Sequence, residues 1–203
     1  MGPKGAVSRA ILCSLAIACA APAMAQFSDS YNFLKAVREA DGDKAMEYLN
    51  KPGAPVLNTR DRTTGETALH ISVKQHQDSW VGFLLNKGAN PDIRDNDGNT
   101  ALHYAALFGD ITAMNYLVGM NAKVNQPNSR GETPLILAVH RRDPLLVRAL
   151  MDAGADPKLA DSIAGKSALD YAKDDPRGTA ILKLLQDAKP TTKKNITGPV
   201  IGF

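Results

Sequence analysis

The sequence predicts an all-α fold, a solenoid of about five repeated helix–turn–helix units, and two regularities in the chain predict it. The first is a short phrase that returns four times, as GETALH at 65–70, GNTALH at 98–103, GETPLI at 131–136 and GKSALD at 165–170. The second is a pair ending in alanine that returns every 33 residues, as Gly88-Ala89, Asn121-Ala122 and Gly154-Ala155. A shared period of this size is typical of stacked units that bury one continuous core.

The phrase marks the start of the first helix in each unit. A hydroxyl residue stands within it, where a side-chain oxygen can cap a helix N-terminus: Thr67, Thr100, Thr133 and Ser167. Pro134 follows one of these residues, at the first helical position, where its missing N–H is not needed. The leucine two residues after each hydroxyl residue is expected to face the core: Leu69, Leu102, Leu135 and Leu169.

A second helix is expected in each unit, because apolar residues recur at spacings of three and four and form one stripe. These stripes are Val81, Leu84 and Leu85; Met114, Leu117 and Val118; Val147, Leu150 and Met151; and Ile181, Leu184 and Leu185. Gly88 and Gly154 are expected to end this helix in the left-handed conformation that glycine adopts without strain. Asn121 takes the same place in the middle unit, and asparagine sometimes replaces glycine there.

The loops between units, such as RDNDG and QPNSRG, carry turn residues and are expected to form hairpin-like fingers. The first finger is one residue longer, at Thr63 or Thr64. The segment 31–50 lacks the repeated phrase and is interpreted as a degenerate first repeat, with the polar outer face that a terminal repeat needs. The repeat domain is expected over 26–188, followed by a flexible tail at 189–203. Its units are expected at about 31–57, 58–92, 93–125, 126–158 and 159–188.

The repeated phrases resemble those of a known family. With the segments TALHISV, TALHYAA, TPLILAV and SALDYAK, each followed by an apolar helix, the chain resembles the ankyrin-repeat family over about 31–188. It is most similar to the small exported ankyrin proteins of Gram-negative bacteria. The resemblance implies that His70 and His103 are structural and hydrogen-bond between repeats. It also implies a concave face, built from fingers and first helices, that binds a protein partner.

The first 25 residues are predicted to be a secretory signal peptide. Lys4 and Arg9 precede an apolar run at 10–21, and the small-residue triplet at 23–25 follows Pro22. This arrangement predicts cleavage between Ala25 and Gln26, because signal peptidase needs small residues at these positions. The apolar run is shorter than the roughly 18 to 20 residues needed to cross a bilayer. A periplasmic or secreted location follows, with a lipoprotein attached at Cys19 as the alternative.

The composition restricts the partners. Both cysteines of the chain, Cys13 and Cys19, lie in the predicted signal peptide, so the exported chain would be stable without disulfides. From Gln26 onward there are 22 basic and 21 acidic residues, which gives no electrostatic footprint for nucleic acid. No segment resembles a basic amphipathic membrane helix. The expected partner is a protein, with no nucleic acid, no cofactor and no membrane insertion after signal removal.

The histidines do not form a recognisable catalytic or metal site. His70 and His103 are one repeat apart, on the order of 10 Å, which is too far to share one zinc ion. His76 and His140 have no matching ligand nearby in the sequence. Neither a G-x-S-x-G motif nor a Gly-rich loop after a strand occurs. We therefore expect neither an enzyme nor a metal site, although an Asp–His pair formed across repeats stays open.

The residues expected on the concave face suggest where a partner binds. Leu107 and Phe108 are apolar, whereas the same positions in the neighbouring repeats hold Lys74-Gln75 and His140-Arg141. An apolar pair on a polar face suggests an anchor; the alternative is that Phe108 folds back over the turn between the helices. The candidate binding residues are Asn96, Asp97, Asn99, Leu107, Phe108, Arg130, His140 and Arg141. Two other functions stay open: an enzyme or small-ligand-binding protein with a pocket on this face, and a secreted effector directed at a host.

Overall fold

The computed structural model describes residues 29–52 and 56–187. The described residues up to Val56 belong to one compact unit, and those from Leu57 onward belong to another. The predicted signal peptide, its cleavage site between Ala25 and Gln26, and the predicted tail at 189–203 lie outside the described residues.

The first unit contains two helices. One covers 29–38, and the other is α2 (Gly42–Leu49). Asp41 caps α2, because its side chain accepts a hydrogen bond of 3.1 Å from the backbone N–H of Lys44. Apolar side chains of the first helix, Phe33 and Leu34 among them, are buried, while Lys35 is exposed.

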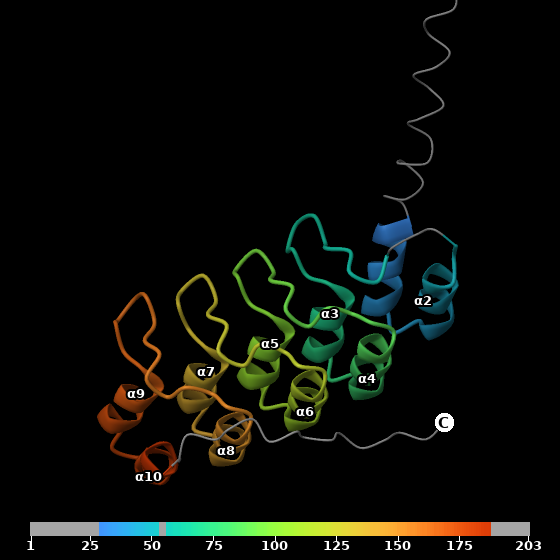
Figure 1. Cartoon of the computed structure of the whole chain (residues 1–203). Helices are drawn as coiled ribbons and strands as arrows, with labels where there is room; N and C mark the ends of the chain where they lie inside the picture. The colour runs from blue at the N-terminus through green and yellow to red at the C-terminus, as the bar shows by residue number, and fades with distance from the viewer. Residues whose placement is uncertain (1–28, 53–55, 188–203) are drawn as a thin grey trace, which may run out of the picture. The chain divides into compact units, whose positions relative to one another are not determined.

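The second unit consists of four helix pairs. Figure 1 shows the first helices of the pairs in one row, the second helices in another, and the fingers projecting on one side. Each first helix packs against its own second helix and, in all but the last of the described pairs, against the first helix of the next pair. All regular elements of the described residues are helices, which confirms the predicted all-α solenoid. The pairs are α3 (Ala68–Lys74) with α4 (Asp78–Asn86), α5 (Ala101–Phe108) with α6 (Ile111–Gly119), α7 (Pro134–Arg141) with α8 (Pro144–Asp152), and α9 (Ala168–Asp174) with α10 (Thr179–Asp187).

The predicted apolar positions form the core, with differences at its margin. Leu69, Leu102 and Leu135 are buried, but Leu169 is half-buried, contrary to expectation. No further first helix follows α9 among the described residues, so one side of Leu169 has no neighbouring repeat to cover it. Three further residues of the predicted stripes are also only half-buried: Val118, Met151 and Leu184.

The second helices end in the same way in three repeats. Gly88, Asn121 and Gly154 have φ angles of 91°, 62° and 90°, in the left-handed region. In each case the alanine that follows donates its N–H to a carbonyl five residues earlier, as in Ala122 to Leu117 at 3.0 Å. Asparagine therefore takes the conformation that glycine takes in the other two repeats.

The fingers are closed at their base by one hydrogen bond each. Asp95 donates to the carbonyl of Asn99 at 2.8 Å, and equivalent bonds join Asn128 to Glu132, Asp61 to Glu66 and Asp161 to Lys166. The last two of these bonds enclose one more residue. The first finger is thus longer, as the sequence predicts, and the last finger is longer too. Neighbouring fingers are also joined, by Asn96 N–H to Thr64 O, Ser129 N–H to Asp97 O and Ser162 N–H to Arg130 O.

Candidate partner-binding surface

Two buried histidines link the repeats beneath the fingers. The Nδ1 atom of His70 accepts a hydrogen bond of 3.1 Å from the backbone N–H of Thr67. Its Nε2 lies 3.1 Å from the carbonyl oxygen of Asn99 in the next repeat. His103 makes the same two contacts, with Thr100 and with the carbonyl of Glu132. Since Nδ1 accepts a hydrogen bond from a backbone N–H and Nε2 faces a carbonyl oxygen, both rings are neutral with their hydrogen on Nε2. This is the structural role that the resemblance implies.

Burial makes these histidines hard to protonate. Loss of hydration lowers the pKa of His103 to about 4, and it lowers the pKa of His70 as well. A second ring proton would have to occupy Nδ1, which already faces the N–H of the capping threonine. The network is therefore complete only in the neutral form.

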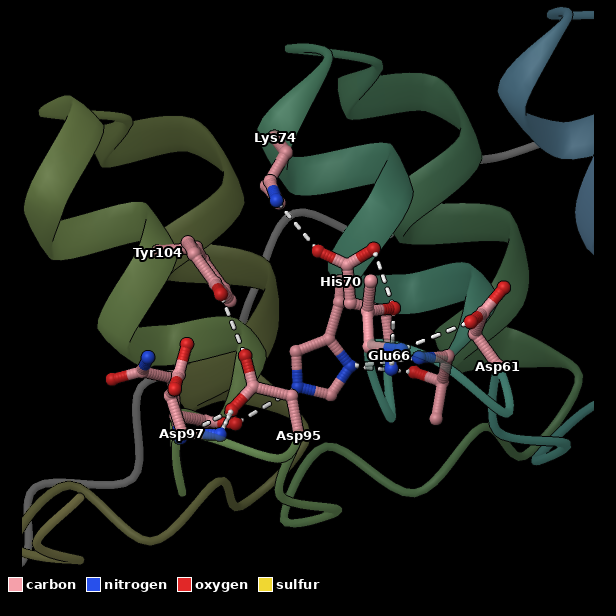
Figure 2. Close-up of polar contacts among 10 residues, drawn as sticks. Asp61, Glu66, His70, Lys74, Asp95, Asp97 and Tyr104 are labelled. Carbon is pink, nitrogen blue, oxygen red and sulfur yellow. Dashed lines mark hydrogen bonds and ion pairs between the residues drawn. The ribbon is translucent and has the colours of Figure 1, made fainter. Parts of the chain in front are cut away.

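Each finger is held in shape by an acid or amide at its base. The Oδ1 atom of Asp95 accepts from the backbone N–H groups of Asp97 and Asn99, at 2.9 and 2.8 Å. Its second oxygen, Oδ2, accepts from the hydroxyl of Tyr104 at 2.6 Å, as Figure 2 shows. The last finger repeats the arrangement, because Tyr171 donates to Oδ2 of Asp161 at 2.5 Å.

Sequence reasoning missed these two tyrosines, although a signal was present. Tyr104 and Tyr171 each stand four residues after the hydroxyl residue that starts the first helix. The hydrogen bond to Asp161 raises the pKa of Tyr171 to about 12. The pKa of Tyr104 is also raised, by burial first and by Asp95 second. Both rings stay protonated near neutral pH, so each hydroxyl remains a donor to its finger.

An apolar cluster lies on α5 at the predicted anchor position. Leu107 is 46% exposed, as expected of a binding residue. Phe108 is half-buried: its ring stacks on Tyr104 with centroids 6.1 Å apart, and it meets His76 edge-on at 5.9 Å. Phe108 is thus held against its neighbours and does not project freely. We call Tyr104, Leu107 and Phe108 the α5 cluster.

The finger residues among the candidates have different environments. Asn96 and Asp97 are exposed at the tip of the second finger, and Asn96 also donates to the carbonyl of Thr63 at 2.8 Å. Asn99 is half-buried, and its side-chain oxygen accepts from the amide of Asn128 at 3.0 Å. The side chain of Asn99 therefore joins two repeats instead of pointing to a partner. Glu66, at the base of the first finger, is only 8% exposed.

Arg141, in the third full repeat, borders the α5 cluster, and Arg130 lies in the finger of the same repeat. Arg141 donates from a guanidinium nitrogen to the carbonyl of Leu107 at 3.3 Å. It lies against Gly109, where an added Cβ would come within 2.4 Å of the Arg141 side chain. Arg130, at the tip of the third finger, is exposed and pairs with Glu132 at 2.7 Å. The structure thus brings Leu107 and Arg141 together, from residues 34 apart in the sequence.

A lysine ammonium group lies over each of these two tyrosine rings. The Lys74 ammonium lies 5.0 Å from the centroid of the Tyr104 ring and pairs with Glu66 at 2.5 Å (Figure 2). The Lys166 ammonium lies 5.9 Å from the centroid of the Tyr171 ring. It pairs with Asp174 at 2.8 Å.

A cavity of about 290 Å³ opens beside Tyr171, between α7 and α9. His140, one of the candidates, lines it, and the His140 and Tyr171 rings lie 4.4 Å apart. Arg142 also lines the cavity and is paired with Asp175 at 2.5 Å. Val139 and Asp174 also line the cavity.

The Asp–His pair across repeats that the sequence left open is present. The Nδ1 atom of His76 lies 3.2 Å from Oδ2 of Asp110. Asp110 also caps α6, because it accepts from the N–H of Ala113 at 2.9 Å. Burial raises the pKa of the neighbouring Asp78, and the Asp110 carboxylate raises it further. These contacts give Asp110 a structural role. Within 29–52 and 56–187, no group of three or more His, Cys, Asp or Glu side chains could hold a metal ion.

Comparisons with known proteins agree with this architecture. Residues 33–128 match a family model of ankyrin repeats in three copies, and residues 119–172 match one of ankyrin repeats in many copies. The chain belongs to the ankyrin-repeat family. Ankyrin repeats are generally protein–protein interaction modules, and proteins built from them are typically scaffolds without enzymatic activity.

Several curated proteins are similar to this chain. An ankyrin repeat-containing protein of Treponema pallidum is 35% identical over 143 residues, which cover 70% of this chain and 47% of that protein. An ankyrin repeat protein of Fowlpox virus is 38% identical over 99 residues, 46% of this chain and 29% of that protein. Neurogenic locus notch homolog protein 1 of Danio rerio is 36% identical over 143 residues, 66% of this chain and 6% of that protein. This chain thus spans about half the length of the first relative and less of the other two.

Among the helices of the described residues, none combines the length and the apolar character needed to cross a bilayer.

Proposed function

We propose that this chain is an exported scaffold that binds a partner protein on the surface formed by its fingers and first helices. The observation that carries the proposal is Leu107, a large apolar side chain that is 46% exposed on a first helix. At the same position the preceding and following repeats present Lys74 and His140, both exposed. Large apolar side chains at the centre of a polar surface are typical of binding hot spots.

The α5 cluster is suited to act as this anchor. Full burial of a leucine side chain is worth about 1.5 to 3 kcal/mol, so Leu107 alone could contribute substantially to affinity. Phe108 and Tyr104 are already ordered by their stacking and by the hydrogen bond to Asp95. Side chains that are ordered in advance lose little conformational entropy on binding. Arg130 and Arg141, on the next repeat, would form a charged rim, which mainly accelerates association.

The proposal includes export. The basic residues, the apolar run and the small residues at 23 and 25 support cleavage before Gln26. Intact mass of the protein from the periplasmic fraction tests this. A chain that begins at Gln26 supports the proposal, whereas a lipid-modified chain that begins at Cys19 would identify a lipoprotein instead.

Cross-linking in intact cells tests the binding surface. Photoreactive residues are placed at Leu107 and at Arg141, with Arg148 as the control, because Arg148 is exposed on the second-helix row. We expect one dominant protein adduct from positions 107 and 141 and none from position 148. Equal labelling from all three positions, or no adduct at 107 and 141, would contradict the proposed surface.

A further inference from the structure

Tyr104 and Tyr171 form two equivalent sites, one on the second and one on the fourth helix pair. Each ring is held in place by its hydroxyl, which donates a hydrogen bond to the carboxylate at the base of its finger. The distance is 2.6 Å to Asp95 and 2.5 Å to Asp161. Hydrogen bonds from a hydroxyl to a carboxylate are short and strong, so they orient the rings before any partner arrives.

The chain itself shows which chemistry these rings accept. Lys74 and Lys166 place their ammonium groups 5.0 and 5.9 Å from the two ring centroids, within the distance at which cations and aromatic rings attract. The two lysines reach the rings by different routes. Lys74 lies at the end of α3, in the preceding repeat, whereas Lys166 belongs to the finger directly before α9. The same placement is thus reached twice from unrelated sequence positions.

Carboxylates border both rings. Lys74 pairs with Glu66 beside Tyr104, and Lys166 pairs with Asp174 beside Tyr171. The side chains of the two lysines are 38% and 46% exposed. Each lysine can therefore move into solvent without leaving the protein surface, which would uncover the ring face that it now covers.

The cavity beside Tyr171 shows that one of the two sites has room for a side chain. Its volume of about 290 Å³ is at the lower limit of small-molecule sites, which usually measure about 300 to 1,000 Å³. Val139 supplies an apolar wall, and Tyr171 and Asp174 supply a ring and a carboxylate. The Arg142 guanidinium in the same lining is already paired with the Asp175 carboxylate. An aliphatic stem that ends in a positive charge matches this lining better than a cofactor does.

We infer that Tyr104 and Tyr171 each bind a lysine or arginine side chain of the partner protein, and that Lys74 and Lys166 cover these sites in its absence. The inference rests on the proposed function, since it names the chemistry of the partner that the scaffold binds. The two tyrosines are two repeats apart, roughly 20 Å at about 10 Å between packed helices. An extended segment covers that distance in about six residues. The partner segment therefore carries two basic residues about six positions apart.

Synthetic peptides test the inference with the full chain. The probe is an uncharged, extended peptide with two lysines six positions apart. Its controls are the same peptide with two glutamates and a peptide with the lysines two positions apart. Binding is followed by NMR, through the ring signals of Tyr104 and Tyr171. We expect both rings to respond to the probe, and the control peptides to bind at least several-fold more weakly.

Two lysine variants provide the sharper measurement. Lys74→Ala and Lys166→Ala remove the competing cations, so each should strengthen binding of the probe about fivefold, the equivalent of one exposed cation–π contact. Lys173→Ala is the matched control, because Lys173 lies on α9 and pairs with Asp170 at 3.3 Å without a ring contact. Tyr104→Leu and Tyr171→Leu should abolish the binding, and circular dichroism of these variants checks that they fold. If the tyrosine variants do not fold, the lysine variants still test the inference.

Several outcomes would overturn the inference. Weaker binding of the probe by the lysine variants, or tighter binding of the glutamate peptide, would mean that the partner is acidic. Equal binding of the two lysine peptides, whatever the spacing of their lysines, would indicate that charge alone attracts them. Unchanged NMR signals of the Tyr104 and Tyr171 rings would exclude both sites. The proposed function is tested separately: a partner that cross-links to position 107 but has no basic segment would refute this inference and leave the scaffold proposal standing.

Discussion

The first two full repeats and the last two share one backbone plan but join to their neighbours through different side chains. His70 and His103 each connect a capping threonine to a carbonyl of the next repeat. The equivalent residue of the third repeat is Ile136, which is fully buried, and that of the fourth is Asp170, which pairs with the capping Ser167 at 2.6 Å. The position is therefore not restricted to one chemistry.

The difference shows which part of the phrase is local and which part joins repeats. Capping of the first helix is local: Thr133 and Ser167 accept from the N–H three residues on, without a histidine. The bond to the next repeat needs a side chain that donates on one side and accepts on the other, which neutral histidine does. Where Ile136 replaces it, apolar contact and an ion pair between Arg142 and Asp175 join the third repeat to the fourth. The histidine repeats should then lose stability in acid through their rings, whereas the last repeat should respond through Asp161 and Asp170, because hydrogen bonds from Tyr171 and Ser167 lower the pKa of these carboxyls.

The largest effect is expected from the core. Leu102→Ala should lower the free energy of unfolding by about 2 to 5 kcal/mol, because it leaves a cavity at a fully buried position between repeats. Leu169→Ala should cost clearly less, since Leu169 is half-buried in the last repeat. Urea denaturation of both variants measures the difference. Equal losses would show that the last repeat is packed as tightly as the middle one.

Acid should weaken the histidine repeats. The pKa of His103 is about 4 in the folded chain and about 6.5 when unfolded, so the unfolded chain binds the proton more tightly. Its contribution, about 3 kcal/mol, is complete above about pH 6.5 and is lost as the pH falls toward 4. The low pKa of His70 acts in the same direction.

Unfolding at a series of pH values compares the wild type with His103→Ile, which introduces the side chain of the third repeat. The variant should be less stable at pH 7, because it leaves the Thr100 N–H and the Glu132 carbonyl without the ring. It should also lose part of the dependence of stability on pH between 4 and 6.5, since the low pKa of His70 remains. If the free energy of unfolding of the variant changed with pH between 4 and 6.5 as steeply as that of the wild type, groups other than His103 would cause the dependence.

The anchor is expected to affect binding more than folding. Leu107→Ala should weaken binding of the captured partner by about 1 to 2 kcal/mol and leave the melting temperature nearly unchanged, because the side chain is exposed. Phe108→Ala should weaken binding similarly, but it should also destabilise the fold by about 0.5 to 1.5 kcal/mol through loss of its ring contacts. Paired titrations and thermal melts separate the two. A Leu107→Ala variant that binds normally would remove the anchor from the proposal.

The smallest effect is expected at the junction of the third and fourth repeats. Arg142→Ala should cost little stability, because its ion pair with Asp175 is close to the solvent. Arg142→Gly should cost less, since Arg142 has a φ angle of 59°, which glycine adopts without strain. Urea melts at low and high salt compare the two variants. A loss larger than that of His103→Ile would mean that this ion pair, and not apolar packing, holds the last repeat.

The sequence alone determined the features that repeat along the chain. The shared period of 33 predicted the stacked helix pairs, and the leucine of each phrase predicted the core through Leu69, Leu102 and Leu135. The left-handed ends at Gly88 and Asn121 could also be predicted, because only a few residue types accept that conformation. Each of these follows from local geometry and from a spacing within one helix.

Only the tertiary structure decided what happens between repeats. It placed Lys74 over Tyr104, Arg141 beside Leu107 and His76 beside Asp110, from positions 30 to 34 apart in the sequence. It also showed that the Phe108 ring is held against its neighbours, where the sequence had left open a free anchor and a ring folded back over the turn. Periodicity says which face of a helix a residue occupies. It does not say which side chain of the next repeat lies opposite, because that depends on rotamers and charges that vary from repeat to repeat.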